Sequence, residues 1–298
     1  MRRYVVIWNR NARQGAAALD AKAELIALAG SSFHETESFE DACRCLENVS
    51  SDDLVIVAGG DGGISGMIDH LHANAIRTTL AVVPLGTGND FVRSLGFAPD
   101  PESAIAAIRA NRTADIDVVR LDYDERTKWF INVAAGGNQR KVERHVDHEV
   151  KQFWGPFAYV RGSLEALPEL EKYQLQLTLD EQPPIDIDLW TLTVANGRTV
   201  GGGIEIAPLA LLNDGQLEVT GLLGEGLVDL GAIAASFLQG EYLDHPSVFY
   251  RRAAQIRLSS EKTFEFSVDG ELIAGRRFAF AALPQAQPMI VGPAIELG

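Results

Sequence analysis

The chain has 298 residues, a formal net charge of -15 and a hydrophobic content of 46%. This length suffices for two domains with separate hydrophobic cores. The acidic balance argues against nucleic acid as a partner, because nucleic-acid binding depends on clustered Lys and Arg, and against a strong electrostatic hold on anionic membranes. The sequence contains no apolar run of the roughly 18–20 residues that a membrane-spanning helix needs.

The first apolar run, Tyr4–Trp8, is too short for the apolar core of a signal peptide. Cys43 and Cys45 lie two residues apart on a predicted helix, where their side chains point in different directions. We therefore expect reduced thiols and a cytoplasmic location.

As far as Asp122, short apolar segments alternate with segments of helical periodicity. The predicted strands are Tyr4–Trp8, Phe33–Thr36, Leu54–Ala58, Leu80–Val83 and Ile116–Leu121. The predicted helices are Ala16–Ala29, Phe39–Val49, Ile64–Leu71 and Glu102–Ala110. This alternation predicts an α/β domain with a parallel sheet that is covered on both faces. In such sheets, ligands bind beyond the carboxyl ends of the strands.

From about Tyr123 onward, strand candidates follow one another, with predicted helices only near Phe157–Leu167 and Leu227–Leu238. The predicted strands are Trp129–Val133, Leu175–Leu179, Asp186–Ala195, Leu217–Leu222, Gln255–Leu258, Phe264–Val268 and Arg277–Ala282. Several alternate apolar with polar residues, which is typical of a β-sandwich. We expect an α/β nucleotide-binding domain over residues 1–124 and a β-sandwich over residues 125–285. Residues 286–298 are free to return to the first domain.

The most informative stretch is Leu54–Gly63, in which an apolar strand runs into Gly59-Gly60-Asp61-Gly62-Gly63. Glycines let backbone N–H groups approach a ligand without hindrance from Cβ. The helix expected from Ile64 would present its N-terminus to an anion. Asp61 beside a phosphate would need a bridging cation such as Mg²⁺. The alternative is a tight turn with a solvated Asp61, although a plain turn rarely needs four glycines. We therefore predict a nucleotide phosphate site.

A second glycine segment, Pro84–Phe91, directly follows the strand Leu80–Val83. It lacks the Lys and the glycine spacing of a Walker loop, which excludes a P-loop NTPase. Two glycine loops after two strands of one sheet indicate a shared ligand better than either loop alone. Together they could cradle one triphosphate, with Thr87 and Asn89 donating hydrogen bonds to its oxygens.

Five segments, taken in order, carry a family resemblance: Gly59-Gly60-Asp61-Gly62, Pro84–Phe91, the glycine-rich stretch from Asn196 to Pro208, Leu212-Asn213-Asp214-Gly215, and Asp269-Gly270-Glu271. Their order and spacing resemble those of diacylglycerol-kinase-like lipid kinases, most closely the bacterial YegS/BmrU-type branch. The resemblance spans nearly the whole chain. A weaker kinship, through the glycine-aspartate loop alone, extends to NAD kinases and phosphofructokinases.

The resemblance implies a kinase that uses ATP and Mg²⁺ in a cleft between the two domains. The implied partner is a diacylglycerol- or phosphatidylglycerol-like lipid, reached by transient membrane contact; a homodimer is left open. Glu271 is implied as the base that accepts the hydroxyl proton, and Asp61 as the organiser of the nucleotide's Mg²⁺. With the two glycine loops, the implied ATP contacts are Thr36, Gly59, Gly60, Asp61, Gly62, Gly63, Ile64, Ser65, Gly66, Gly86, Thr87 and Asn89.

The resemblance also implies a second Mg²⁺ outside the phosphate site. It would be held by the carboxylate of Asp214 and by the backbone carbonyl oxygens of Leu211 and Gln216. Carboxylate and carbonyl oxygens beside a sharp turn are suitable ligands for a hard cation. A plain turn capped by Asp214 is the alternative.

Two positions of the first loop depart from the family pattern. Gly63 stands where the family usually has Thr, and Gly66 stands where it usually has Glu, which removes a hydroxyl and a carboxylate. Two other readings therefore stay open: a family member that binds nucleotide or lipid without turnover, and a kinase of a soluble substrate such as NAD. The family's Pro after Asn9 is also missing, and Arg10 and Arg13 are candidates to meet phosphate instead.

Several other groups are weaker candidates. The pairs Arg251–Arg252 and Arg276–Arg277 could meet lipid head groups or be ordinary surface. His145 and His148, with Glu149, could ligate a metal or belong to a solvated charged face. Phe153, Trp154 and Phe157 could form an apolar lip for acyl chains, although core packing is the commoner role.

Overall fold

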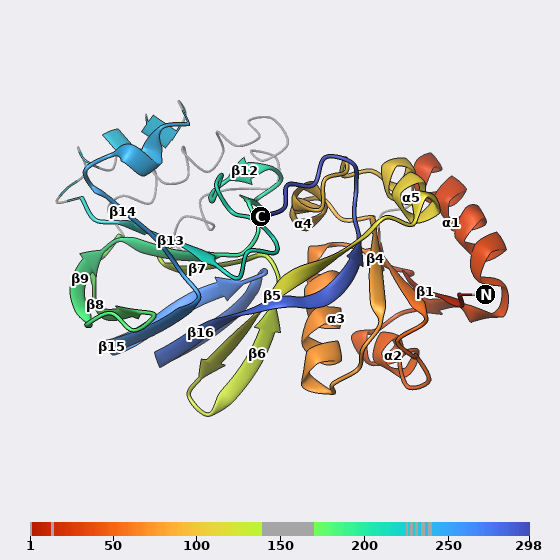
Figure 1. The fold of residues 1–298 in the computed structure, drawn as a ribbon, viewed down its shortest axis with the longest axis horizontal. Helices are drawn as coiled ribbons and strands as arrows, with labels where there is room; N and C mark the ends of the chain where they lie inside the picture. Colours follow the sequence, from red (N-terminus) through yellow and green to blue (C-terminus); the bar gives the residue numbers. More distant parts are fainter. Residues whose placement is uncertain are drawn as a thin grey trace.

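The structure, a computed structural model, describes residues 2–12, 15–138, 170–224, 226, 229, 232–233, 236–237 and 240–298. Two lobes lie side by side, the first built of helices around a parallel sheet and the second mainly of β-strands (Figure 1). The predicted α/β domain followed by a β-sandwich is therefore confirmed. In the part of the chain that the structure describes, no helix is both long and apolar enough to cross a membrane.

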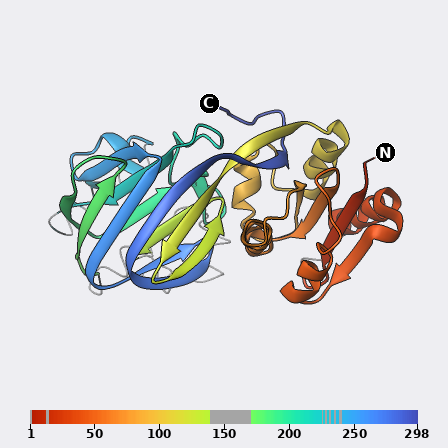
Figure 2. The ribbon, with the colours of Figure 1, turned by 60° about the horizontal axis from the view of Figure 1, so that its bottom comes forward.

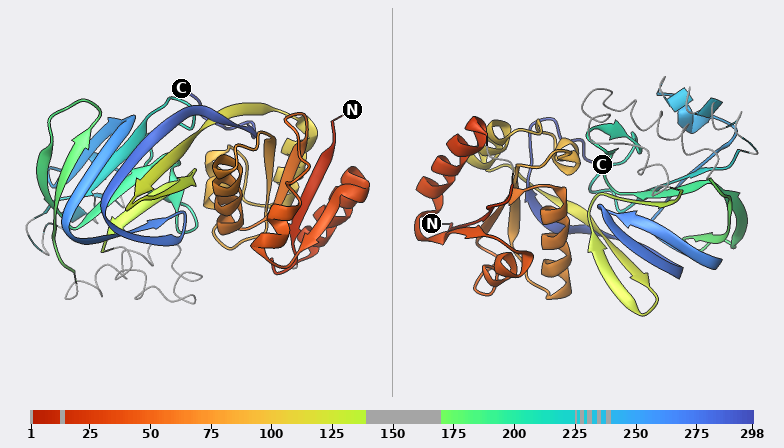
Figure 3. Two further views of the ribbon diagram at one scale, coloured as in Figure 1. Left: turned by 90° about the horizontal axis from the view of Figure 1, so that it is seen from below. Right: turned by 180° about the vertical axis from the view of Figure 1, so that it is seen from behind.

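The first lobe is organised around four parallel strands in the order β4-β3-β1-β2: β1 (Tyr4–Asn9), β2 (Phe33–Thr36), β3 (Leu54–Gly59) and β4 (Thr79–Pro84). Every residue of β3 and β4 is buried, as expected for strands covered on both faces. Helices α1 (Ala16–Ala29) and α5 (Pro101–Ala110) lie on one face of this sheet, and α2 (Phe39–Arg44) and α3 (Asp61–Ala73) lie on the other (Figure 3).

Two helices of this lobe differ in extent from the prediction, and one helix was not predicted. Helix α2 ends at Arg44 rather than Val49. After it the chain forms turns with hydrogen bonds three residues apart, such as that from the Cys45 amide to the carbonyl of Ala42. Helix α3 begins at Asp61 rather than Ile64, so the glycines after Asp61 form its first turn. The short helix α4 (Asp90–Ser94) was not predicted.

The second lobe encloses its own core between layers of antiparallel strands (Figure 2). Its described strands are β5 (Thr113–Tyr123), β6 (Arg126–Phe130), β7 (Val133–Gly137), β8 (Tyr173–Leu179), β9 (Ile185–Leu189), β10 (Thr191–Ala195), β13 (Leu217–Leu222), β14 (Val248–Ala253), β15 (Gln255–Val268) and β16 (Glu271–Ile290), with a separate pair β11 (Thr199–Val200) and β12 (Ile204–Glu205). The core contains a cluster of buried rings that contact one another edge to face, among them Phe130, Phe264, Phe266, Phe278 and Phe280.

Strand boundaries in the second lobe also differ from the prediction. The predicted strand Trp129–Val133 is divided between β6 and β7, and Asp186–Ala195 is divided at Trp190 between β9 and β10. Conversely, Gln255–Leu258 and Phe264–Val268 form one strand, β15, whose pairing with β16 shifts register between Ser259 and Phe264. Strand β16 is 20 residues long and β14 was not predicted. Local patterns mark the apolar segments, but the pairing partners decide where each strand begins and ends.

Strands β5 and β16 connect the lobes and run side by side between them (Figure 2). Strand β16 pairs with β15 at its start, with β5 along much of its length, and with β4 where Met289 lies opposite Leu80. Met289 therefore belongs to the core of the first lobe. Beyond β16, the amide of Gly292 donates to the carbonyl of Leu95 at 2.8 Å.

Candidate active site

The two predicted glycine loops lie against each other at the carboxyl ends of β3 and β4. The amide of Leu85 donates to the carbonyl of Gly59 at 2.8 Å. A Cβ added to Gly86 would lie only 2.7 Å from the Cα of Gly60, so two backbones meet where side chains cannot fit. The structure thus brings together the loop residues that the sequence singled out.

Asn89 gives the second loop its shape. Its backbone is left-handed, with φ of 51°, and its side-chain oxygen accepts from the Gly86 amide at 3.0 Å. Its side-chain amide donates back to the carbonyl of Gly86, also at 3.0 Å. Asn89 was expected to donate to phosphate, but here both ends of its amide close the loop. Thr87, at the tip of the loop, is exposed.

Two carboxylates flank Gly88 in this loop. A Cβ added to Gly88 would lie 3.0 Å from Asp61 Oδ2 and 3.1 Å from Asp90 Oδ2. Asp61 also accepts from the amide of Phe91 at 3.4 Å, which ties the start of α3 to the start of α4. Carboxylate oxygens are ligands that a hard divalent cation prefers.

Asp90 was part of the second glycine segment, but the sequence assigned it no role. Its buried carboxylate accepts from the amides of Gly202 at 3.0 Å and Gly203 at 2.8 Å. Burial raises the pKa of Asp90, and the charge of Asp61 adds to this rise, while the two glycine amides and Arg93 oppose it. The available signal was a carboxylate next to a glycine loop, but its distant glycine partners are visible only in the fold.

A pocket of about 240 Å³ opens beside the second loop. Its walls are the first turn of α1, the loop itself, Arg93 and the segment before α5: Gly15, Ala17, Ala18, Pro84, Leu85, Gly86, Thr87, Gly88, Asn89, Arg93, Pro99, Asp100 and Pro101. The first turn of α1 carries no acidic residue, so the partial positive charge of its amides is not neutralised there. With Arg93 and the loop amides, this wall suits an anionic group.

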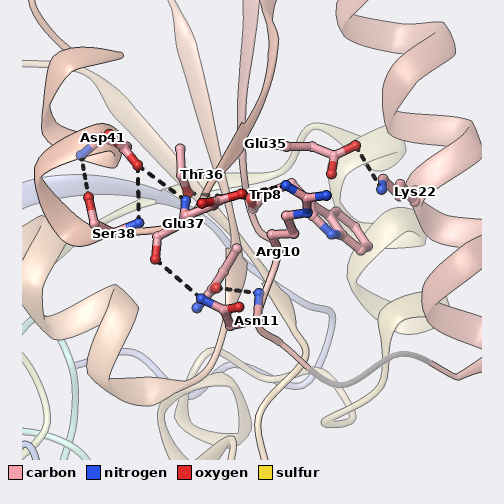
Figure 4. A network of polar contacts seen from close by, with 10 residues as sticks. Trp8, Arg10, Asn11, Lys22, Glu35, Thr36, Glu37, Ser38 and Asp41 are labelled. Atoms are coloured by element: carbon pink, nitrogen blue, oxygen red, sulfur yellow. Dashed lines mark hydrogen bonds and ion pairs between the residues drawn. The ribbon is translucent and has the colours of Figure 1, made fainter.

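The carboxyl ends of β1 and β2 form the next part of the site (Figure 4). The amide of Arg10 donates to the carbonyl of Thr36 at 3.0 Å, and the buried Thr36 hydroxyl donates to the carbonyl of Trp8 at 3.3 Å. The guanidinium of Arg10, a candidate to meet phosphate, instead forms an ion pair with Glu37. Arg13 lies outside the described residues.

The two glycines that depart from the family pattern have different surroundings. A Cβ added to Gly63 would meet no atom within 4 Å, so this position faces open space. A Cβ added to Gly66 would lie 2.7 Å from the ring of Phe39, which packs onto the backbone of α3. The aromatic ring of Phe39, on α2, therefore occupies the space that a side chain at position 66 would need.

The Asp269-Gly270-Glu271 turn of the second lobe contacts helix α3 of the first lobe. The partly buried Asp269 carboxylate accepts from the amides of Ile131, Asn132 and Val133, the residues between β6 and β7, at 2.9–3.2 Å. Burial raises the pKa of Asp269, and these amides and the Ser65 hydroxyl oppose the rise. Ser65 was expected to contact ATP, but it lies on α3 bonded to the second lobe.

Glu271 lies on the side of α3 that carries Ser65 and Asp69. Its Oε2 is 2.7 Å from Nζ of the buried Lys128, and that Nζ is 3.8 Å from the Asp69 carboxylate. Asp61, Ser65 and Asp69 are spaced four residues apart and so share one face of α3, about 6 Å apart along its axis. The side chain of Glu271 is 65% exposed, and its partner Lys128 lies beside Asp69, about 12 Å along the helix axis from Asp61.

The loop predicted to hold a second Mg²⁺ contains Asp214, which accepts from the Gln216 amide at 2.9 Å and forms an ion pair with Arg252. Among the described residues, no group of three or more His, Cys, Asp or Glu side chains is arranged to hold a metal ion. The other predicted metal and apolar candidates, His145, His148, Glu149, Phe153, Trp154 and Phe157, lie outside the described residues.

Comparison with known proteins agrees with this geometry. Residues 3–121 match the family model described as the diacylglycerol kinase catalytic domain, and residues 132–291 match that of the YegS C-terminal NAD kinase beta sandwich-like domain. The chain belongs to the diacylglycerol kinase family.

Curated members of this family include the diacylglycerol kinase of Staphylococcus epidermidis (strain ATCC 12228), which is 32% identical over 245 residues, covering 80% of this chain and 75% of that enzyme. The Staphylococcus haemolyticus diacylglycerol kinase is 31% identical, and the match covers 74% of this chain and 65% of that enzyme. A solved diacylglycerol kinase structure from Bacillus anthracis has a TM-score of 0.79 at 26% identity, with 99% of both chains covered.

Proposed function

We propose that this chain is an ATP- and Mg²⁺-dependent kinase that phosphorylates the hydroxyl of a lipid resembling diacylglycerol or phosphatidylglycerol. The observation that carries the proposal is the contact between Gly60 and Gly86, at which the second glycine loop meets the residue before the first turn of α3. A polyphosphate is the ligand class that such loops bind at the start of a helix. The family match supports transfer of a phosphoryl group to a lipid.

In this proposal, the first turns of α1 and α3 and the loop at residues 86–88 hold the phosphates of ATP. Asp61 would hold the nucleotide's Mg²⁺, because its Oδ2 lies beside Gly88 where the two loops meet, while the Asp90 carboxylate is held by the amides of Gly202 and Gly203. When bound, Mg²⁺ would neutralise charge on the phosphate oxygens. Phosphoryl transfer depends mainly on positioning and charge neutralisation, so this set of groups is sufficient.

Glu271 acts in this proposal as the base. Its carboxylate takes the proton of the lipid hydroxyl while the hydroxyl oxygen bonds to the transferred phosphorus and the bond to ADP breaks. Lys128 pairs with this carboxylate at 2.7 Å and holds it beside α3. The lipid reaches Glu271 by transient contact of the protein with the cytoplasmic membrane surface.

Incubation with labelled ATP, Mg²⁺ and mixed vesicles of diacylglycerol and phosphatidylglycerol tests the proposal. We expect label in the organic phase. E271Q should lower the rate at least 10²-fold, which is the usual contribution of a general base, while ATP affinity stays unchanged. E261Q is the matched control, because Glu261 is an exposed acid on β15.

Three results would redirect the assignment. No labelled lipid, with E271Q equal to wild type, contradicts the proposal. Label in the aqueous phase with NAD as acceptor favours a kinase of a soluble substrate. ATP binding measured by calorimetry without label in either phase favours a member that has lost transfer, the alternative motivated by Gly63 and Gly66.

A further inference from the structure

The loop at residues 212–216 is joined to the sheet by one arginine. The guanidinium of Arg252, on β14, contacts Oδ2 of Asp214 through Nη2. Through Nε it lies 3.0 Å from Oε1 of Glu218, on β13. Glu218 and Arg252 are directly opposite each other in the β13–β14 pairing. One cation therefore bridges two carboxylates that come from different elements.

These carboxylates need a positive charge because they are removed from water. The side chain of Glu218 is 2% exposed and that of Asp214 is 14% exposed, whereas that of Arg252 is 41% exposed. Burial raises the pKa of Glu218 and the charge of Asp214 adds to the rise, while the Tyr250 hydroxyl and Arg252 oppose it. A buried carboxylate without a partner is strongly unfavourable, so the guanidinium neutralises both groups at once.

The other sides of Asp214 are also occupied. Its Oδ1 accepts from the Gln216 amide, and Gly298 lies over it, where an added Cβ would be 2.8 Å from the Asp214 Cβ. The amide of Gly298 donates to the side chain of Asn213 at 2.7 Å. Mg²⁺ requires a near-octahedral set of oxygen ligands and usually retains water. An Asp214 carboxylate that already binds an amide and a guanidinium does not fit that requirement.

We propose that the guanidinium of Arg252 takes the position at Asp214 that the family resemblance assigns to a second Mg²⁺, so that this loop closes without a metal ion. A guanidinium stays charged and offers its donors in a planar fork, which suits a bridge between two carboxylates. It belongs to the chain, so the bridge cannot be removed by a chelator. The inference concerns this loop and does not involve the nucleotide's Mg²⁺.

Thermal unfolding of the nucleotide-free protein tests the inference without an activity readout. We expect the wild-type midpoint to be the same in EDTA and in millimolar MgCl₂, because a metal ion that binds the folded state raises the midpoint by mass action. A Mg²⁺-induced rise in wild type that is abolished by D214N would overturn the inference.

The variant R252M removes the charge and keeps most of the apolar stem. We expect a lower midpoint in EDTA and a rise of several degrees when Mn²⁺ or Mg²⁺ is added, because the two carboxylates are then free to bind a metal. R251M is the matched control: the neighbouring guanidinium lies over the Phe249 ring and should not affect metal response. If Mn²⁺ did not stabilise R252M, the inference that the Arg252 guanidinium and a metal ion compete for one position at Asp214 would be wrong.

If R252M fails to fold, a binding measurement decides the same point. Titration of Mn²⁺ into wild type and D214N, followed by electron paramagnetic resonance, should give identical binding without nucleotide. A Mn²⁺ site that wild type has and D214N lacks would contradict the inference. R252K, which keeps a charge at this position, should fold and remain insensitive to EDTA.

Discussion

Replacing Gly86 by alanine is a direct test of the convergence of the two glycine loops. The new Cβ would lie 2.7 Å from the Cα of Gly60 and 2.9 Å from Oδ1 of Asn89. Real Cβ contacts are longer, and the nearest atom is backbone, so the loops must separate. Overpacking of this kind costs about 1–3 kcal/mol. In a protein of this size, each kcal/mol lowers the melting temperature by about 2–4 °C.

The larger effect is expected on ATP binding. Separation of the loops moves the loop at residues 86–88 and the first turn of α3 away from a common ligand, and a displacement of about 1 Å can lower activity about 10²-fold. Calorimetry should show ATP affinity for G86A reduced at least about tenfold, which corresponds to roughly 1.4 kcal/mol. Thermal unfolding of the same sample gives the change in stability.

G62A is the matched control for the change in melting temperature of G86A. A Cβ on Gly62 would meet nothing within 4 Å, and the residue lies in the first turn of α3. Alanine favours a helix over glycine by up to about 1 kcal/mol, so the melting temperature of G62A should be unchanged or higher. If G86A matched wild type in both melting temperature and ATP affinity, the reasoning about converging loops would be refuted.

Three further predictions concern the surroundings of the site. D269A leaves three buried amides without an acceptor and should lower the free energy of unfolding in urea by about 3 kcal/mol or more, whereas D115N, at an exposed position, should not. Because the pKa of Asp90 is raised in the folded state, protonated Asp90 stabilises the fold at low pH, and this stabilisation is lost as pH rises from 3.8 through the raised pKa. In urea titrations at several pH values, D90N should remove this decrease in the free energy of unfolding. The same pH dependence in D90N and wild type would contradict the prediction. G66A should stabilise an F39A protein by about 1 kcal/mol but not wild type, where the ring blocks the new Cβ; equal effects in both backgrounds would show that Phe39 does not constrain Gly66.

The sequence identified the loops that meet in the site but not all of their contacts. Glycines after β3 and β4 are visible because the absence of a side chain is a property of single positions. The partners of Asp90 are not visible, because Gly202 lies 112 residues away in the chain and only folding brings it near. Likewise, Asp269 was noted only beside Glu271, whereas in the structure it binds the amides that separate β6 from β7.

The sequence alone determined the division into an α/β lobe and a β-sandwich, because the spacing of apolar residues along one segment decides whether it buries a helix face or a strand. Tertiary structure decided which charged groups meet. A carboxylate at a turn, such as Asp214, can bind a metal ion or a guanidinium. The choice depends on the register of β13 with β14, which places Arg252 opposite Glu218 and beside Asp214. Register is set by the packing of whole strands and not by any local pattern.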